Sequence, residues 1–168
     1  FLGFFFKNSR DSDEYLKTIV NGVEPLLEAK MKNYFLVLQN GASLFTSSNK
    51  VTLDEWHSFL EYNKFKKDFP AIVDEGVAFR AHKGDLSSFV KGLHLKENQT
   101  FVYRALPAFS AEEEEANRLR QEAYLVTYTE PFPEGMQPGL DLATERARRL
   151  AAELARDMGE PTISGKIK

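Results

Sequence analysis

Residues 77–110 hold the side chains that are the best candidates for chemistry. The stretch reads as a strand, a short polar helix and a second strand, with Arg80 inside the first apolar run and Ser110 just after the second. An arginine within an apolar strand needs an anionic partner, because an unpaired buried charge is very costly. We therefore expect Arg80 either to pair with one of the chain's many glutamates or to bind a phosphate group.

The other familiar kinds of reactive site have no support in the sequence. The P-loop and the motifs G-x-S-x-G and G-x-G-x-x-G are absent, so the signatures of kinases, hydrolases and Rossmann domains are missing. The histidines share no metal-ligand spacing with one another or with a carboxylate cluster; they are His57, His82 and His94. The glutamates at 112–115 fall in or near the first turn of an expected helix, where the helix dipole favours them. We therefore expect no bound metal.

The elements that would position these residues indicate an α+β fold. Apolar runs at 77–81, 100–105 and 123–129 predict strands of a mixed or antiparallel sheet. Helical spacing predicts helices at 53–67, 111–122 and 141–158, and a short helix follows Asp85. Thr52 and Glu55 form a capping-box pattern at the first of these helices, and Ser110 is expected to cap the second. The last helix carries an apolar stripe that we expect to be buried, and residues 162–167 are expected to form a final strand.

A β-hairpin is expected near residues 34–47. Asn40 and Gly41 lie between two apolar runs, and an Asn-Gly pair suits the positive φ angles of a tight hairpin turn. A continuous helix through 26–38 is the alternative, because the apolar residues there also fit helical spacing. Before this point we expect a short strand at 2–6 and a helix that starts at Asp13 and breaks near 21–24.

Length and composition indicate one globular domain without disulfides. The chain has 168 residues, a net charge of −3 and no cysteine, with 42% hydrophobic and 28% charged residues. We expect a single α+β domain over 1–168, with residues 1–12 as an N-terminal docking segment. The absence of cysteine favours the cytoplasm or another reducing compartment, and no signal peptide or transmembrane segment is evident. The lack of a basic excess argues against a nucleic-acid partner. A start at Phe1 rather than Met indicates a processed product or a fragment.

The order of elements across residues 53–165 resembles the mono-ADP-ribosyltransferases. The resemblance rests on Phe79-Arg80 in a strand, a short helix, Gly92 before the next strand, and Phe109-Ser110 before an acidic helix. It implies NAD as the cofactor, contacted by Phe79, Arg80 and Phe109. It also implies a catalytic set of Arg80 on the NAD phosphates, Ser110 in the strand motif and Glu160 as the catalytic acid. Arg104 lies in a similar context, so the register of the arginine motif stays open. Met158 and the Ala108-Phe109-Ser110 sequence depart from the family pattern and favour a degenerate transferase over an active one.

A non-catalytic protein is the alternative function. Its contact surfaces would be the proline-rich loop at 131–139, the charged helix at 141–158 and an apolar docking strand at 1–6. On this alternative the partner is another protein.

Overall fold

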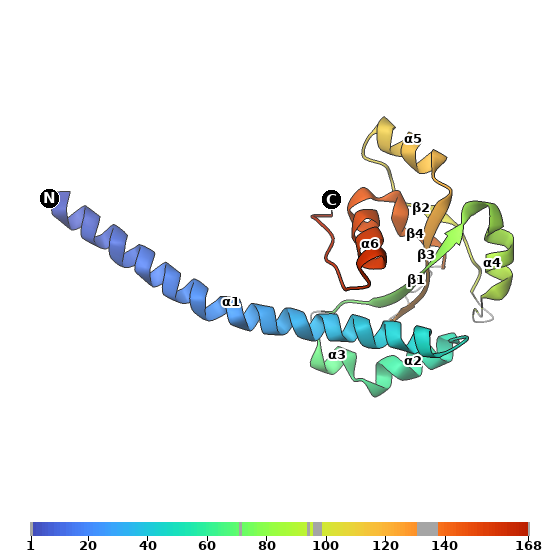
Figure 1. Cartoon of the computed structure of the whole chain (residues 1–168), viewed down its shortest axis with the longest axis horizontal. Helices are drawn as coiled ribbons and strands as arrows, with labels where there is room; N and C mark the ends of the chain where they lie inside the picture. The colour runs from blue at the N-terminus through green and yellow to red at the C-terminus, as the bar shows by residue number, and fades with distance from the viewer. Residues whose placement is uncertain (1, 71, 94, 96–98, 131–137, 168) are drawn as a thin grey trace. The chain divides into compact units, whose positions relative to one another are not determined.

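The computed structural model describes residues 2–70, 72–93, 95, 99–130 and 138–167. The chain divides into two compact units, Phe1–Ser47 and Ser48–Lys168 (Figure 1). The first contains one long helix, and the second contains the sheet with its covering helices. The proline-rich loop expected at 131–139 lies outside the described residues, apart from Pro138 and Gly139.

Helix α1 (Leu2–Ser47) is 46 residues long and has Pro25 in its interior. At a rise of 1.5 Å per residue its length is about 69 Å. The strand expected at 2–6, the helix break near 21–24 and the hairpin at 34–47 are therefore wrong, and so is the docking strand at 1–6. The helix considered as the alternative for 26–38 is the observed structure.

The physical reason lies in cooperative helix propagation. Each added residue gains a backbone hydrogen bond once a helix has started, whereas a two-strand hairpin is marginal unless its apolar face is covered. An interior glycine costs a helix about 1 kcal/mol and a proline about 3 kcal/mol. The backbone hydrogen bonds of a helix with this many turns offset both costs. The helical spacing of the apolar residues therefore outweighs the local Asn-Gly turn signal.

The second unit is built on a four-stranded mixed sheet in the order β1-β3-β4-β2. Strands β1 (Glu75–His82) and β3 (Glu122–Glu130) pair antiparallel over most of their length, with a bulge between Val77 and Ala78. Strand β4 (Leu140–Asp141) pairs antiparallel with β3 and parallel with β2 (Arg104–Ala105). Gly139 enters β4 with a φ of +118°, and an added Cβ there would lie 2.3 Å from the carbonyl oxygen of Val102. Only glycine fits this close approach.

Short helices flank the sheet (Figure 1). They are α2 (Leu53–Tyr62), α3 (Phe65–Asp68), α4 (Leu86–Gly92), α5 (Ala111–Leu119), α6 (Arg146–Met158) and the 3₁₀ turns Lys83–Asp85 and Leu142–Thr144. One face of the sheet buries Ala81, Ala123 and Leu125 against Leu86, Phe89 and Phe101. Tyr124 lies on the opposite face, where its hydroxyl accepts a 3.0 Å hydrogen bond from Arg156 of α6.

The α+β class and the mixed sheet are confirmed. Thr52 and Glu55 form the expected capping box, and Ser110 caps α5 as expected. The helix expected at 53–67 is interrupted, because Lys64 adopts a left-handed φ of +52°. Of the strand expected at 100–105, only Arg104–Ala105 is a strand, and residues 162–167 form none. The stripe of α6 is not buried: Leu150, Leu154 and Met158 are 50–60% exposed.

Candidate functional site

Asp141 is the buried polar centre of the second unit. Its side chain is fully buried, and its Oδ1 accepts hydrogen bonds from the backbone N–H groups of Tyr124 (2.9 Å) and Ala143 (3.0 Å). Its Oδ2 accepts a hydrogen bond from the hydroxyl of Tyr103 at 3.1 Å. Burial, together with the charge of Asp141, raises the pKa of Tyr103 to about 12. Asp141 therefore joins β3, β4 and the segment before β2 at one point.

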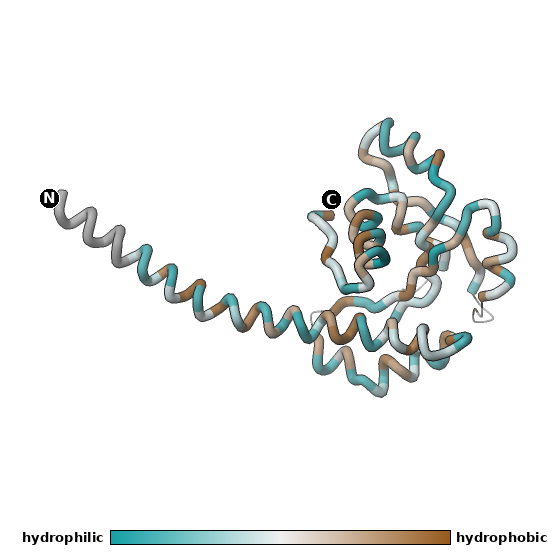
Figure 2. The backbone as a smooth tube through the Cα atoms, in the orientation of Figure 1, coloured by the Kyte–Doolittle hydropathy of each residue, from teal (hydrophilic) through white to brown (hydrophobic). Residues whose placement is uncertain are grey.

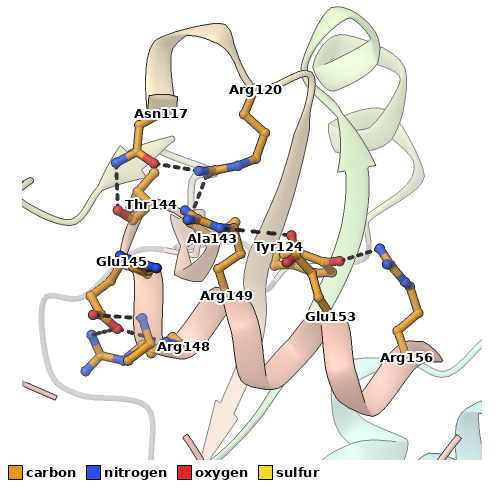
Figure 3. Close-up of polar contacts among 12 residues, drawn as sticks. Asn117, Arg120, Tyr124, Ala143, Thr144, Glu145, Arg148, Arg149, Glu153 and Arg156 are labelled. Carbon is orange, nitrogen blue, oxygen red and sulfur yellow. Dashed lines mark hydrogen bonds and ion pairs between the residues drawn. The ribbon is translucent and has the colours of Figure 1, made fainter. Parts of the chain in front are cut away.

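Arginines connect this centre to α5 and α6 (Figure 3). Arg120 and Arg149 both donate to the carbonyl oxygen of Ala143, at 2.5 and 3.0 Å, and Arg120 also donates to Asn117. Burial and the nearby Arg149 lower the pKa of Arg120. The ends of both guanidinium groups are held by protein carbonyl or amide oxygens, which is the arrangement of a structural network.

The structure places Ser110 and Glu160, two of the three residues expected to be catalytic, near opposite ends of α6 (Arg146–Met158), while Arg80 has a partner of its own on the sheet. Arg80 forms an ion pair with Glu122 on the neighbouring strand, and its side chain is 53% exposed. This is the glutamate-paired alternative considered for Arg80. Ser110 caps α5, next to the first turn of α6, where Glu113 of α5 accepts from the backbone N–H of Arg146.

Glu160 is exposed just beyond the other end of α6. The 13 residues of α6 span about 20 Å, so Ser110 and Glu160 lie near opposite ends of that helix. Phe109, expected to contact a cofactor, is 56% exposed, whereas Phe79 packs against Phe89 and Tyr128.

A wide groove runs between α5, α6 and the C-terminal segment. Its volume is about 950 Å³, and its lining is mainly apolar, with Phe109, Leu150, Leu154 and Ile163 each at least half exposed. Ser110 lies in this groove, while Arg80 and Glu160 do not line it. The groove is more open to solvent than the cavity described next.

A smaller cavity, the Glu75 pocket, lies where α2 and α3 meet the start of β1 and the end of β3. Its volume is about 410 Å³. Leu60 and Phe65 form buried apolar walls, while Glu75 and Glu130 face each other across β1 and β3. His57 of α2 lies between two carboxylates, 3.2 Å from Glu130 and 3.4 Å from Glu61.

Glu75 is the one strongly unsatisfied acid of this pocket among the described residues. Its Oε1 atom is hidden from solvent and has no protein hydrogen-bond partner. Burial raises the pKa of its carboxyl group. Because this oxygen has no surface that water can reach, it faces protein atoms and not the open space of the pocket, and its unmet hydrogen bond makes the ionised side chain costly.

The comparison with protein families decides what kind of domain this is. The model of the CHASE domain matches residues 49–168, which include every strand and all the helices except α1. The chain belongs to the CHASE domain family. No curated protein matches the chain.

The assignment to the CHASE family corrects the resemblance to mono-ADP-ribosyltransferases, which was wrong. The description of the chain as a transferase that uses NAD was therefore wrong as well. The resemblance failed because it rested on an order of elements and on single residues, and many α+β folds share such an order. The glutamate partner of Arg80 and the capping role of Ser110 account for both residues without a cofactor.

Neither a membrane-spanning helix nor a metal-ligand cluster occurs in the described part of the chain. Among the helices of the described residues, none combines the length and the apolar character that a membrane span needs. Within the same part of the chain, no three His, Asp or Glu side chains gather as metal ligands would.

Sequence reasoning did not find the residues of the Glu75 pocket. In the sequence, Glu75 lies in an Asp-Glu-Gly run typical of a turn before a strand, and His57 lies beside Trp56 on an expected helix, a position typical of a partly exposed surface residue. The available signal was the position of Glu75 and Glu130 at the ends of two strands that pair. Their register cannot be read before the pairing of the strands is known.

Proposed function

We propose that residues 49–168 form a non-catalytic sensory domain that binds a small molecule in the Glu75 pocket. The main support is the family match, because a CHASE domain is a sensory, ligand-binding domain. Such domains are usually extracellular or periplasmic, so the proposal places the domain outside the cytoplasm, in contrast to the expectation drawn from the lack of cysteine.

The choice of pocket follows from its shape and chemistry. Small-molecule sites are concave, about 300–1,000 Å³ in volume, and combine apolar walls with a few polar groups that fix orientation. The Glu75 pocket has this volume, an apolar wall that includes Phe65, and the acidic side chains of Glu75 and Glu130. The α5–α6 groove is larger, but the polar groups of the adjoining arginine network are already satisfied by protein atoms.

The test is an unbiased ligand screen that reports position. The full chain, labelled with ¹⁵N, is titrated with a library of neutral, anionic and cationic fragments, and backbone amide shifts are mapped. We expect hits whose shifts gather at the start of β1 and along α2. Hits confined to the α5–α6 groove, or no hits at all, would contradict the proposal.

A blocking variant sharpens this test. Val73 lines the pocket and is 85% exposed, so Val73→Trp adds bulk at the mouth of the pocket without disturbing the core. Leu119→Trp is the matched control, because Leu119 is 59% exposed at the end of α5 and does not line the pocket. Ligand affinity should fall in the first variant and stay unchanged in the second.

A second candidate function is self-association through α1. Leu16, Val20, Val23 and Leu27 are each more than half exposed and follow the alternating four- and three-residue spacing of a heptad. Figure 2 shows apolar segments recurring along this helix. A seam of this period is buried well by another helix with the same repeat, so we propose a second copy of this chain as the protein partner.

A further inference from the structure

We infer that the outer edge of β1 is a docking surface for a second copy of this chain, whose own β1 pairs with it antiparallel. The inference goes beyond the proposed ligand pocket, and it uses a surface separate from the apolar seam of α1. Its support is the direction of the backbone groups of β1, the exposure of that edge and the fit of the strand to itself.

Strand β1 is a long and regular edge strand. It lies at one end of the sheet and, among the described strands, pairs only with β3. It has eight residues and no proline, whereas edge strands are commonly short or interrupted. The bulge beside it puts the extra residue, Thr127, in β3, so the backbone of β1 itself stays regular. Such an edge offers a row of N–H and C=O groups to another strand.

Two hydrogen bonds show which backbone groups of β1 point outward. The N–H of Gly139 donates to the carbonyl oxygen of Val126 at 2.8 Å, so Val126 directs its backbone groups toward β4. Ala78 lies opposite Val126 and therefore directs its own N–H and C=O groups away from β3. The N–H of Lys83 donates to Gln121, on the β3 side, at 2.7 Å. By alternation, the even-numbered residues of β1 point to the free edge and the odd-numbered ones to β3.

The free edge is open. The even-numbered residues of β1 are all exposed: Gly76, Ala78, Arg80 and His82. Among the described residues, no hydrogen bond joins their backbone groups to another element. A charged side chain at an edge normally discourages pairing, but Arg80 forms its ion pair with Glu122 of β3. The charge that would protect this edge is therefore neutralised on the inner side of β1.

The strand fits itself in an antiparallel register centred on Ala78. In this register Ala78 faces Ala78 of the copy, and Arg80 faces Gly76, which has no side chain to clash with it. A register in which Arg80 faces its own copy would set like charges opposite each other, which is destabilising. The pair is isologous and uses both free edges, so it closes at a dimer.

The remaining facing pairs of this register are also complementary. His82 faces Asp74 of the copy. Nδ1 of His82 accepts from the N–H of Gly84 at 3.1 Å, so the hydrogen of the ring lies on Nε2 and can donate to that carboxylate. On the other face of the sheet, Phe79 faces Val77, and an aromatic residue opposite a β-branched one is a favourable cross-strand pair.

The contact is small and therefore weak. Eight paired residues span about 27 Å. One strand pair buries much less than the roughly 1,200 Å² at the lower limit of a standard interface. We therefore expect a chain whose α1 seam is disrupted to remain monomeric at micromolar concentration, and the experiments below detect the edge contact directly.

The first experiment adds a synthetic peptide of residues 73–83 to the ¹⁵N-labelled full chain at millimolar concentration. In the free chain the amide hydrogens of residues 78, 80 and 82 should exchange quickly with solvent, whereas those of 79 and 81 should exchange slowly. The peptide should slow the exchange of the first group. A peptide methylated on the nitrogen of Ala78 loses a donor to the edge and should bind about tenfold more weakly. Methylation on the nitrogen of Phe79, at the peptide's other edge, is the matched control and should change binding little.

The second experiment tests the second copy itself. The chain has no cysteine, so Ala78→Cys supplies a single thiol. In the proposed register the facing Cα atoms are about 5.5 Å apart, within the range that a disulfide spans. Under mild oxidation this variant should form disulfide-linked dimers much faster than Leu119→Cys, whose thiol replaces a side chain that is 59% exposed at the end of α5.

The outcomes are decisive and independent of the ligand pocket. No binding of the unmodified peptide, or an equal loss for both methylated peptides, would overturn the edge as a pairing site. Equal rates of cross-linking for the two cysteine variants would overturn the second copy as its occupant. The fragment screen tests the Glu75 pocket, and Val23→Glu tests the α1 seam, so failure of either proposal is seen separately from failure of this one.

Discussion

Replacing Asp141 tests whether the second unit depends on one buried carboxylate. Asp141→Ala leaves three donors without an acceptor: the backbone N–H groups of Tyr124 and Ala143 and the hydroxyl of Tyr103. Asp141→Asn is a much milder change. The amide oxygen can replace Oδ1 and still accept from both backbone groups, and the amide nitrogen can donate to a rotated Tyr103 hydroxyl.

The magnitudes follow from the number of bonds lost. A hydrogen bond to a charged group contributes about 1.5–3 kcal/mol, and a buried donor left unsatisfied costs a similar amount. Neighbouring contributions do not add fully, so we expect Asp141→Ala to lower the free energy of unfolding by about 4–6 kcal/mol. Asp141→Asn should cost about 1–2 kcal/mol. Single domains are stable by only about 5–15 kcal/mol, so the alanine variant should be close to unfolded.

The assay is urea-induced unfolding followed by the fluorescence of Trp56. This residue is the only tryptophan of the chain and is 4% exposed within the second unit, so its emission reports on that unit. A cost below about 1 kcal/mol for Asp141→Ala, or equal costs for alanine and asparagine, would refute the account of Asp141 as an acceptor for three donors. Tyr103→Phe removes one bond and should cost about 1 kcal/mol.

Four further predictions follow from the same contacts. Thr52→Ala removes the capping box of α2 and should lower the free energy of unfolding by about 1 kcal/mol in a urea melt. The pKa of Tyr103 is raised to about 12, so its contribution to the free energy of unfolding is present below pH 10 and is lost as the pH rises through 12. Phenolate absorbance should therefore show one tyrosine that ionises at a higher pH than the others. Glu75→Gln should raise the melting temperature of the ligand-free chain at pH 7, and this gain should disappear below about pH 4, where the wild-type carboxyl group is protonated. Val23→Glu should shift the chain to monomers in sedimentation equilibrium, whereas Asn21→Glu, away from the apolar seam, should not.

Local signals predicted the second unit well. The capping box at Thr52 and the cap at Ser110 are short-range patterns whose hydrogen bonds form within one turn, so the sequence alone specifies them. The central strands at 77–81 and 123–129 carry enough apolar residues to be recognised before their pairing is known. The hairpin failed for the opposite reason. Asn40-Gly41 is a strong turn signal only if two strands can be covered, and the long helical period around it prevails.

The apolar stripe of α6 shows a different limit. Its period was correct, and it identified the helix, but a period does not show what covers the apolar side. In the structure that side faces the open α5–α6 groove, so Leu150 and Leu154 remain half exposed. The candidate site was missed for a related reason: Glu75, Glu130 and His57 come from three elements, and only the paired strands and the packing of α2 bring them together.

Glu75 links the proposed function to the stability of the domain. A carboxylate with a buried oxygen and no donor costs free energy in the ligand-free fold, and burial raises its pKa for the same reason. If the residue had a purely structural role, its replacement by glutamine would lower stability or leave it unchanged. If it holds a ligand, the same replacement should stabilise the free domain and weaken ligand binding, which is the usual trade-off at a functional site. A variant that is more stable in the free state but binds the ligand more weakly is therefore the expected result for a binding carboxylate. A ligand held by the Glu75 side chain should raise the melting temperature of the wild-type chain more than that of Glu75→Gln.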